Sequence, residues 1–530
     1  MSISTKLLAA LGLAGLAGAA QAAGPVGAGN QFFISGSTAL NNQVYDALLL
    51  APANGGPCLA GSITIYTDAP VVTGGNLTKT KSQANIVCTL ANAITGGPAA
   101  NTVVAFSKES SGGSNEGTYY EAAQAKLTFF DMTQAPTGCG ADQGPIAAGH
   151  YWTNQQAIAH EFDGCTGPTT SVIPQIGLAD ENPALFNIGA QAISAALIAN
   201  LNTTPLFQNQ FNVAVSMPLY RALQAAQGLT TTPPDDSLAK MPTLSRAQIA
   251  GLFGGFITNF SQIGLAAHSV YTCRRGDNSG SNVSADAYFL HNRCTTDSPT
   301  MVGIVSGSGA TGTGPCANLP AGQTAENNGC TWTAGAAPTG NLSDLTFGGA
   351  GTGDVLLCLD AHSRNGDFAY GPVGGTSKFD DPNGATGAAA ETGTNHWRYI
   401  AIGGNKPTVI GMANGNYDYA FDNVENVWTG LAGNPLGVAT FVATLFQSPI
   451  ALGDILVAQP SALSSGGVLD ANYVGGGLQD AFTATPNATP TTLAAVKANP
   501  VSAFTYQASA ATDNCQVPLT PNTSVSKEQL

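Results

Sequence analysis

The chain has 530 residues and a formal net charge of -15, with only 17 lysines and arginines. So few cations argue against a surface for nucleic acid or for anionic membranes, because both need clustered positive charge. Charged residues make up 9% of the chain, against about 25% in an average globular protein. Small residues, including 65 glycines, take the place of part of the missing charged residues. The hydrophobic fraction of 43% is too high for a disordered chain, and the length suggests about two to four compact units.

The first 22 residues have the features of a secretory signal peptide. Lys6 supplies the positive charge, an apolar stretch runs from Leu7 to Ala20, and Ala20-Gln21-Ala22 fits a cleavage site. We expect the mature chain to begin near Ala23 and to reside in the periplasm or outside the cell. No cysteine ends the apolar stretch and no later apolar run reaches the length of a membrane span, so we expect neither a lipid anchor nor membrane insertion.

Ten cysteines fit an exported protein, because oxidising compartments favour disulfides. No Cys-x-x-Cys pair occurs, and the spacings do not indicate a zinc site. Spacing leaves the connectivity open; the economical expectation is local pairing with one longer link: Cys58–Cys88, Cys139–Cys165, Cys273–Cys294, Cys316–Cys330 and Cys358–Cys515.

Three times, a short predicted strand runs into a turn of serine and glycine and then into a predicted helix. The strands are 31–34, 101–106 and 269–272; the turns are 35–38, 108–114 and 274–281; the helices are 39–50, 119–127 and 284–292. This arrangement aims backbone N–H groups at an anion, because the first amides of a helix have no partner within it.

Further strands and helices alternate between these units. A strand is predicted over 173–179 and delivers Asp180, and another over 212–217 precedes a helix over 218–227. Ser245 is a plausible cap for a helix within 244–253. Alternating strands and helices indicate α/β layers. Low charge and abundant glycine, alanine and threonine predict loop-rich insertions over 131–170, 296–395 and 460–500.

The turns carry what a dehydrated tetrahedral oxyanion needs. Hydroxyl and amide donors are available near Thr38 and Ser110, and the guanidinium of Arg275 could donate hydrogen bonds to two oxygens at once. A carboxylate such as Asp180 helps only when the ligand donates a hydrogen bond to it, which favours protonated phosphate over sulfate. Taken singly, Ser37-Thr38 suits a helix cap, Asp180 suits a cap or turn, and Arg275 could form a surface ion pair.

The order of these motifs resembles the phosphate-binding proteins of ABC uptake systems, in particular the longer branch that includes the DING proteins. Four motifs carry the resemblance: G-S-T-A at 36–39, S-S-G-G at 110–113, G-L-A-D at 177–180 and R-R-G-D-N-S-G-S at 274–281. Residues 244–263 and 415–424 also resemble family segments. The matched pieces cover about a third of the chain. The DING signature is absent from the mature N-terminus, Ser281 stands where threonine is usual, and 296–395 has no counterpart.

The resemblance implies a set of ligand-binding residues: Thr38, Ala39, Ser110, Asp180, Arg275, Ser279, Gly280 and Ser281. Asp180 would accept the proton of the ligand, and Asp277 would orient Arg275. The resemblance also implies an α/β fold of two lobes, of the type II periplasmic-binding-protein class, with mixed sheets flanked by helices.

We expect lobe 1 to comprise 23–210 and 420–530 and lobe 2 to comprise 211–419, with chain crossings near 205–215 and 415–425. The ligand would lie between the lobes, at loops that follow strands, and the lobes would close on it by a hinge motion. The expected partners are inorganic phosphate or a related oxyanion and an ABC-transporter permease, with no nucleic acid.

The alternative is a secreted structural or adhesive protein that keeps the fold with an unused cleft. An enzyme is not expected, since the six histidines are scattered and no G-x-S-x-G or phosphate-loop motif occurs. A secreted phosphatase ranks last, because neither a nucleophile with its base nor a metal cluster is evident. No cofactor and no metal are expected. Tyr417, Tyr419 and Phe421 alternate as in a strand and are predicted to be core or cleft wall.

Overall fold

The fold is described from a computed structural model of the chain. It describes residues 25–68, 83–189, 191–232, 234–294, 299, 301–303, 324–326, 329–331, 346–349, 352–374, 396–457, 478–479 and 492–502. The predicted signal peptide and its cleavage site lie outside the described residues, as do Cys316 and Cys515.

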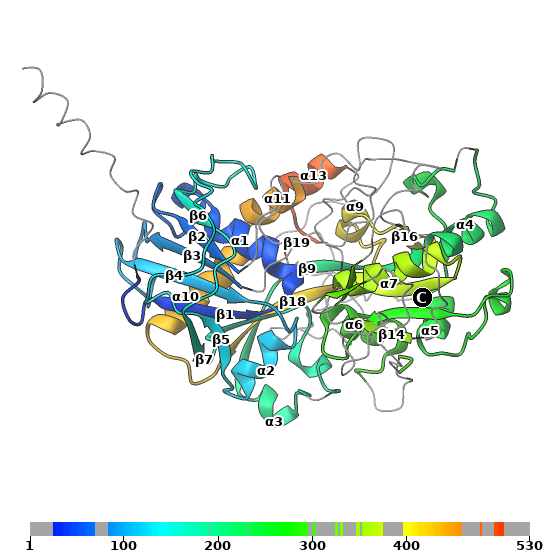
Figure 1. Ribbon diagram of the computed structural model, residues 1–530, viewed down its shortest axis with the longest axis horizontal. Coiled ribbons are helices and arrows are strands. Elements are labelled where there is room, and N and C mark those ends of the chain that lie inside the picture. The colour runs from blue at the N-terminus through cyan, green and yellow to red at the C-terminus, as the bar shows by residue number, and fades with distance from the viewer. Residues whose placement is uncertain are drawn as a thin grey trace, which may run out of the picture.

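One mixed sheet of 13 strands runs through the molecule in the order β14-β11-β15-β9-β18-β8-β1-β4-β3-β2-β6, with β16 and β19 also paired to β9. The strands of the first half are β1 (Gln31–Gly36), β2 (Thr64–Thr67), β3 (Gln83–Thr89), β4 (Val103–Glu109), β6 (His160–Phe162) and β8 (Ile176–Ala179). Those of the second half are β11 (Tyr271–Arg275), β14 (Thr346–Gly349), β15 (Ala369–Gly374) and β16 (Trp397–Tyr399). The long strands β9 (Leu201–Ser216) and β18 (Ala420–Trp428) lie between the two groups (Figure 1).

The pairing of β9 with β18 joins the halves. They run antiparallel, with Trp428 opposite Leu201 and Ala420 opposite Gln210. β9 has 16 residues and spans about 50 Å at 3.4 Å per residue, so it reaches into both halves. The sequence predicts one sheet per lobe with crossings near 205–215 and 415–425. The structure has strands at those positions, and they merge the two predicted sheets into one because each is long enough to pair on both sides.

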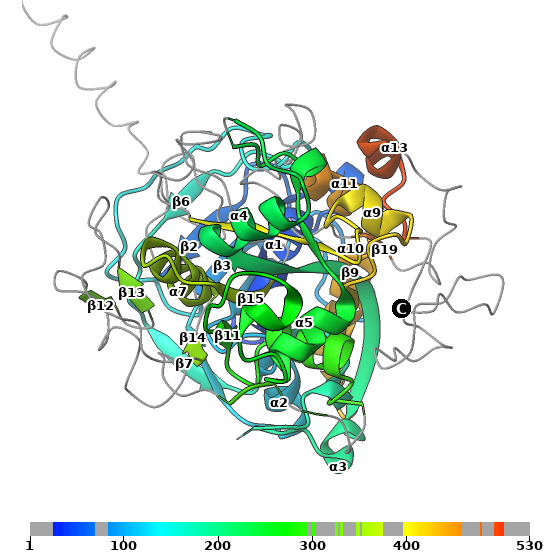
Figure 2. The ribbon, with the colours of Figure 1, turned by 90° about the vertical axis from the view of Figure 1, so that its right-hand side faces the viewer.

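Smaller strands lie outside or at the edge of this sheet: β5 (Leu127–Phe130) with β7 (Thr169–Val172), β10 (Thr243–Leu244) with β17 (Ala401–Ile402), β12 (Thr324–Glu326) with β13 (Gly329–Thr331), and β19 (Leu478–Gln479) on β9. The α-helices are α1 (Asn41–Leu49), α2 (Glu116–Ala122), α3 (Ala195–Ile198), α4 (Met217–Ala226), α5 (Arg246–Phe253), α6 (Gly280–Ala285), α7 (Thr352–Arg364), α9 (Val409–Ala413), α10 (Asn434–Phe446), α11 (Pro449–Val457) and α13 (Leu493–Ala498). Short helical turns are η1 (Thr38–Leu40), η2 (Pro52–Asn54), η3 (Pro183–Leu185), η4 (Leu238–Lys240), η5 (Phe260–Ile263) and the π-turn η6 (Asp286–Leu290). Figure 2 looks onto the second half, where α4, α5 and α7 surround the strands.

The predicted mixed α/β class, with a large mixed sheet flanked by helices, is therefore confirmed. Strands β1, β4, β8, β9 and β11 overlap the predicted ones, and α1, α2, α4, α5 and α6 with η6 overlap the predicted helices. Ser245 caps α5 as predicted: its hydroxyl accepts from the Gln248 amide at 3.1 Å, and the Gln248 side chain accepts from the Ser245 amide at 2.9 Å.

Separate apolar cores stabilise the two halves. In the first half, Phe32, Ile34 and Phe106 pack with α1 and α10, and Leu206 and Phe207 of β9 complete that core. In the second half, Phe211, Val213 and Val215 of the same strand join another core. Tyr417, Tyr419 and Phe421 lie in this second core, each 1% exposed or less, as predicted, but only Phe421 belongs to a strand, because β18 begins at Ala420.

Part of the predicted insertion over 296–395 is sheet and helix. β14 pairs in parallel with β11, β15 lies between β11 and β9, and α7 follows β14. The prediction of a loop-rich insertion is therefore wrong for 346–349 and 352–374. Glycine is required there: a Cβ on Gly371 would lie 1.8 Å from the carbonyl oxygen of Cys273 on the neighbouring strand, so only glycine lets the strands approach.

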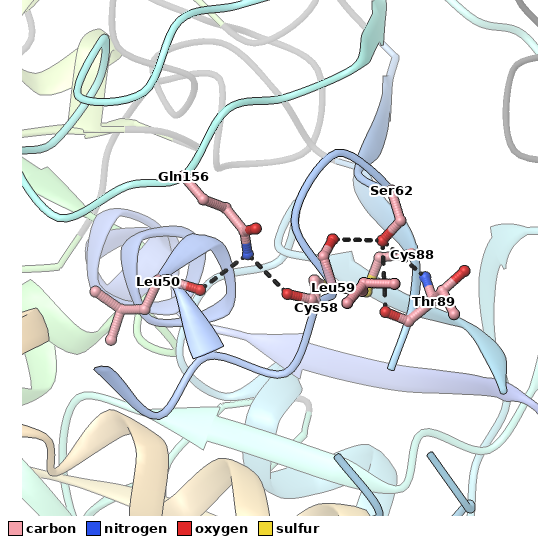
Figure 3. The surroundings of a disulfide bond; sticks show 7 residues. All are labelled: Leu50, Cys58, Leu59, Ser62, Cys88, Thr89 and Gln156. Carbon is pink, nitrogen blue, oxygen red and sulfur yellow. Dashed lines mark hydrogen bonds between the residues drawn. A yellow bond between two sulfur atoms is a disulfide. The ribbon is translucent and has the colours of Figure 1, made fainter. Parts of the chain in front are cut away.

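Three disulfides join the described residues. Cys58–Cys88 and Cys139–Cys165 are confirmed. The predicted links Cys273–Cys294 and Cys358–Cys515 are wrong, because Cys273 on β11 pairs with Cys358 on α7, which packs against that strand. Figure 3 shows Cys58–Cys88, where the Gln156 side chain donates to the carbonyls of Leu50 and Cys58, both at 3.0 Å. The predicted Cys316–Cys330 link lies outside the described residues.

In the part of the chain that the structure describes, every helix is too short or too polar to span a bilayer.

Candidate functional site

Asp180 is the point where four distant turns meet. It follows β8 and is 4% exposed. The Ser37 hydroxyl donates to its Oδ1 at 2.5 Å, and the Ser114 hydroxyl donates to its Oδ2. Gly280 lies against the same carboxylate, since a Cβ at position 280 would be 2.0 Å from Oδ2. Residues 37, 114, 180 and 280 are therefore neighbours in space.

The first turn follows β1 and is pressed against β8. The Ser37 amide donates to the Leu178 carbonyl at 2.9 Å. Gly36 has φ +107°, and a Cβ there would lie 2.0 Å from that carbonyl oxygen, so the position requires glycine. The Ser37 hydroxyl also accepts from the Ala39 amide at 3.1 Å, which closes the turn locally.

The second turn, from Ser110 to Asn115, lies beside the first and beside Arg275. The exposed Thr38 donates its hydroxyl to the Ser110 carbonyl at 3.1 Å, and Asn41 donates to the Ser110 hydroxyl at 3.3 Å. A Cβ on Gly113 would be 3.6 Å from Arg275 Nη2. The arginine from the second half thus reaches a turn of the first half.

The last turn begins where β11 ends and leads into α6. Arg275 donates to the Thr352 hydroxyl at 3.4 Å, and the hydroxyls of Ser279 and Ser281 lie 3.2 Å apart. Asp277 does not orient Arg275 as the resemblance implies. It pairs instead with Arg274 at 3.1 Å, because the side chains of successive residues on a strand point to opposite faces.

Charge is concentrated and poorly solvated here. Burial raises the pKa of Asp180, and hydrogen bonds from Ser114 and Ser37, with the charges of Arg275 and Lys108, partly oppose that rise. Burial lowers the pKa of Arg275 to about 10, against the opposing effects of Asp354 and Asp180. Lys108, 1% exposed, donates to the carbonyls of Gly36 and Ser37 at 3.0 and 3.2 Å, and burial lowers its pKa to about 8.

The structure brings the sequence-predicted residues together. Thr38 and Ala39 lie with Ser110, while Asp180 touches Gly280, which is flanked by Ser279 and Ser281.

Sequence reasoning missed four residues of this cluster: Ser37, Ser114, Lys108 and Thr352. Ser37 and Ser114 belong to the serine- and glycine-rich turns and could have been found there. Lys108 is one of few lysines and lies two residues before Ser110, within the turn 108–114 that the sequence predicts. Thr352 carried no usable signal, because it lies in the stretch that the sequence predicts to be an insertion.

The described residues contain one group with the spacing of metal ligands, Cys273, Cys358 and His362. The two cysteines form a disulfide, so their sulfurs are not available as thiolate ligands. At the cluster around Asp180 the described groups are hydroxyls, the cations Arg275 and Lys108 and the Asp180 carboxylate, a set with too few acceptors for a metal ion.

No protein-family model and no curated protein sequence matches this chain. Solved structures do match. One is a Clostridium perfringens protein assigned as a phosphate ABC-transporter substrate-binding protein, with bound phosphate: 10% identity, TM-score 0.37, covering 80% of this chain and 96% of that one. An ABC-type phosphate-transport receptor from Vibrio cholerae has 10% identity and a TM-score of 0.26 over 51% of this chain and 74% of its own. PstS from Borrelia burgdorferi has 10% identity and a TM-score of 0.26, covering 52% and 74%.

Proposed function

We propose that this chain is an exported solute-binding protein that holds phosphate, or a similar tetrahedral oxyanion, between two lobes. One observation carries the proposal: four turns, far apart in sequence, gather hydroxyls, the start of a helix and an arginine around the buried carboxylate of Asp180. A dehydrated oxyanion needs this mixture of neutral donors, one cation and one acceptor.

Each predicted residue has a role in the proposed complex. Ser110 would donate its hydroxyl. Thr38 would donate its hydroxyl and Ala39 its amide in exchange for their present bonds to the Ser110 carbonyl and the Ser37 hydroxyl. Arg275 would contribute a charged fork, while Ser279, Gly280 and Ser281 would add the donors of the last turn. Ser279 is the N-cap of α6, so the amides that follow it lie in the first turn of a helix, where amides lack partners within the helix.

Asp180 would select among oxyanions. Burial raises the pKa of Asp180, which makes it a better hydrogen-bond acceptor than an ordinary aspartate, and Ser37 and Ser114 fix both of its oxygens. Hydrogen phosphate can donate a hydrogen bond to this carboxylate, whereas sulfate, which carries no proton, would meet it as a like charge.

The proposal includes the domain division 23–210 with 420–530, and 211–419. Thr38, Ser110 and Asp180 would then come from lobe 1 and Arg275 to Ser281 from lobe 2, so that ligand stabilises the closed arrangement. No chemical turnover is required. An ABC-transporter permease is the proposed partner, with periplasmic or extracellular residence.

Titration calorimetry with phosphate, arsenate and sulfate on ligand-stripped protein tests the proposal. Arg275→Ala should weaken phosphate binding about 10- to 100-fold, the value of a charge-assisted hydrogen bond. Asp180→Asn should weaken phosphate binding less and should reduce the rejection of sulfate. Arg364→Ala, which removes an arginine bonded to Asp360, is the matched control and should bind like the wild type.

Two results would count against the proposal. Absence of heat with every oxyanion would refute oxyanion binding and favour a secreted structural or adhesive protein with an unused cleft. Equal rejection of sulfate by the wild type and by Asp180→Asn would remove the selective role of Asp180.

A further inference from the structure

Two buried glutamates bracket the second turn. Glu109 ends β4 and is 3% exposed, and Glu116 begins α2 and is 6% exposed. The Ser111 amide donates to Glu109 Oε1 at 3.0 Å, and the Gly112 amide donates to Glu116. The Glu116 side chain covers Gly112 so closely that a Cβ there would lie 2.4 Å from its Oε1. The turn is thus held from both ends by carboxyl groups.

The two carboxyl groups also meet each other. The Glu109 and Glu116 side chains are hydrogen-bonded, yet the Oε2 atom of each has no other donor. Two ionised carboxylates can only accept hydrogen bonds, so a bond between them requires a proton on one of the two. The geometry therefore implies that this pair carries one proton.

The surrounding charges agree with one negative charge on the pair. Lys108 is the cation that faces both glutamates, and it faces Asp180 as well. The other titratable groups that face the pair are neutral phenols: Tyr45 on α1 and Tyr120 on α2. Burial raises the pKa of Glu116 to about 9, and the negative charge of Glu109 adds to that rise.

We propose that Glu109 and Glu116 share one proton, and that this carboxyl–carboxylate bond positions the turn Ser110–Asn115 so that Ser110 and Ser114 face the oxyanion site. That Ser110 and Ser114 face an oxyanion site rests on the proposed function, whereas the positioning of the turn by the shared proton does not. The pair is a positioning device and does not itself touch the ligand.

The proton linkage has a definite sign. The pKa of Glu116 is higher in the folded chain than its ordinary value of 4.5, so the stabilisation from its proton is fully present below that value. It is lost as the pH rises through about 9. Raising the pH across this range should leave two repelling carboxylates and release the turn.

The mobility of the turn can be measured without any ligand. Ser111 is exposed, so Ser111→Cys offers a site for a spin label, and its backbone amide still donates to Glu109. Label mobility should rise between about pH 8 and about pH 10. Glu116→Gln should abolish this rise, because its amide donates to Glu109 at every pH. Glu121→Gln is the matched control on the same helix: burial raises the pKa of Glu121 to about 8, but its carboxyl group is bonded to Ser35 and not to Glu109, so the rise should persist.

Phosphate affinity should fall about tenfold per pH unit above the transition in the wild type and should fall less steeply in Glu116→Gln, where only the loss of charge on Lys108 remains. Mobility that is independent of pH, or a rise that survives Glu116→Gln, overturns the proposal. If Glu116→Gln does not fold, Glu109→Gln tests the same bond from the other side. A mobility transition without phosphate binding at any pH would support the shared proton between Glu109 and Glu116 and refute the proposed function.

Discussion

Replacing Gly280 by alanine tests the convergence of the turns directly. An added Cβ would lie 2.0 Å from Asp180 Oδ2, 2.5 Å from Ser114 Oγ and 2.8 Å from Asp180 Cβ. Each separation is shorter than a carbon can tolerate, so the carboxylate and the serine must move. Because the Ser114 hydroxyl donates to that carboxylate, Gly280→Ala should break this bond.

The structure sets the size of the effect. Loss of a hydrogen bond to a charged group costs about 1.5–3 kcal/mol, and alanine returns about 0.4–1 kcal/mol by restricting the unfolded chain. Gly280→Ala should therefore lower the free energy of unfolding by about 1–2 kcal/mol. Phosphate affinity should fall at least about tenfold, equivalent to about 1.4 kcal/mol, since Asp180 is displaced.

Gly276 offers a matched control in the same turn. A Cβ there would meet no heavy atom within 4 Å, so Gly276→Ala should leave stability unchanged or slightly raised. Urea unfolding followed by tryptophan fluorescence measures stability, and calorimetry measures affinity. If the two alanine variants are equally stable, Gly280 does not lie against Asp180 and the described convergence is wrong.

Two further predictions concern stability. Replacing both Cys273 and Cys358 by serine removes a disulfide that joins residues 85 apart and should lower the free energy of unfolding by about 4–5 kcal/mol. The same change at Cys139 and Cys165, which are 26 residues apart, should lower it less. Urea midpoints measure both variants, and a larger loss of stability for the shorter loop would contradict the pairing. Burial raises the pKa of Glu425 well above 4.5, so its protonated form stabilises the fold at low pH and that contribution is lost as the pH rises. Glu425→Gln should therefore gain stability relative to the wild type between about pH 5 and about pH 8 in urea unfolding, and parallel pH profiles would show that Glu425 is not buried as described.

In the first half the sequence predicts β1, β4, β8, α1 and α2, because these elements have simple periodicity, but it misses β2, β3, β5, β6 and β7. The apolar run at Gln31 and the helical spacing through Val44 and Leu48 correspond to β1 and α1. In the second half the same rules fail at β15, where Gly371 is needed for close approach to Cys273 and its composition is typical of a loop. Composition cannot separate a glycine that allows flexibility from one that allows tight packing.

The site could be predicted from the turns but not from their partners. Thr38, Ser110 and Asp180 stand in recognisable motifs, whereas the link between Ser37 and Asp180 spans 143 residues and follows only from the pairing of β1 with β8. Asp277 was assigned to the wrong arginine because a sequence does not say which face of β11 Arg274 occupies. The disulfide of Cys273 likewise follows from the packing of α7 on that strand, not from spacing.

The position of β18 in the sheet has a consequence for biosynthesis. β18 covers the edge of β8, with Val424 opposite Ala179, so these strands are about 245 residues apart in the chain. A ribosome makes β8 long before its neighbour, and until then the backbone groups on one edge of β8 have no partner. Such late completion delays folding of the first half during synthesis, because contacts between strands so far apart in the chain form slowly.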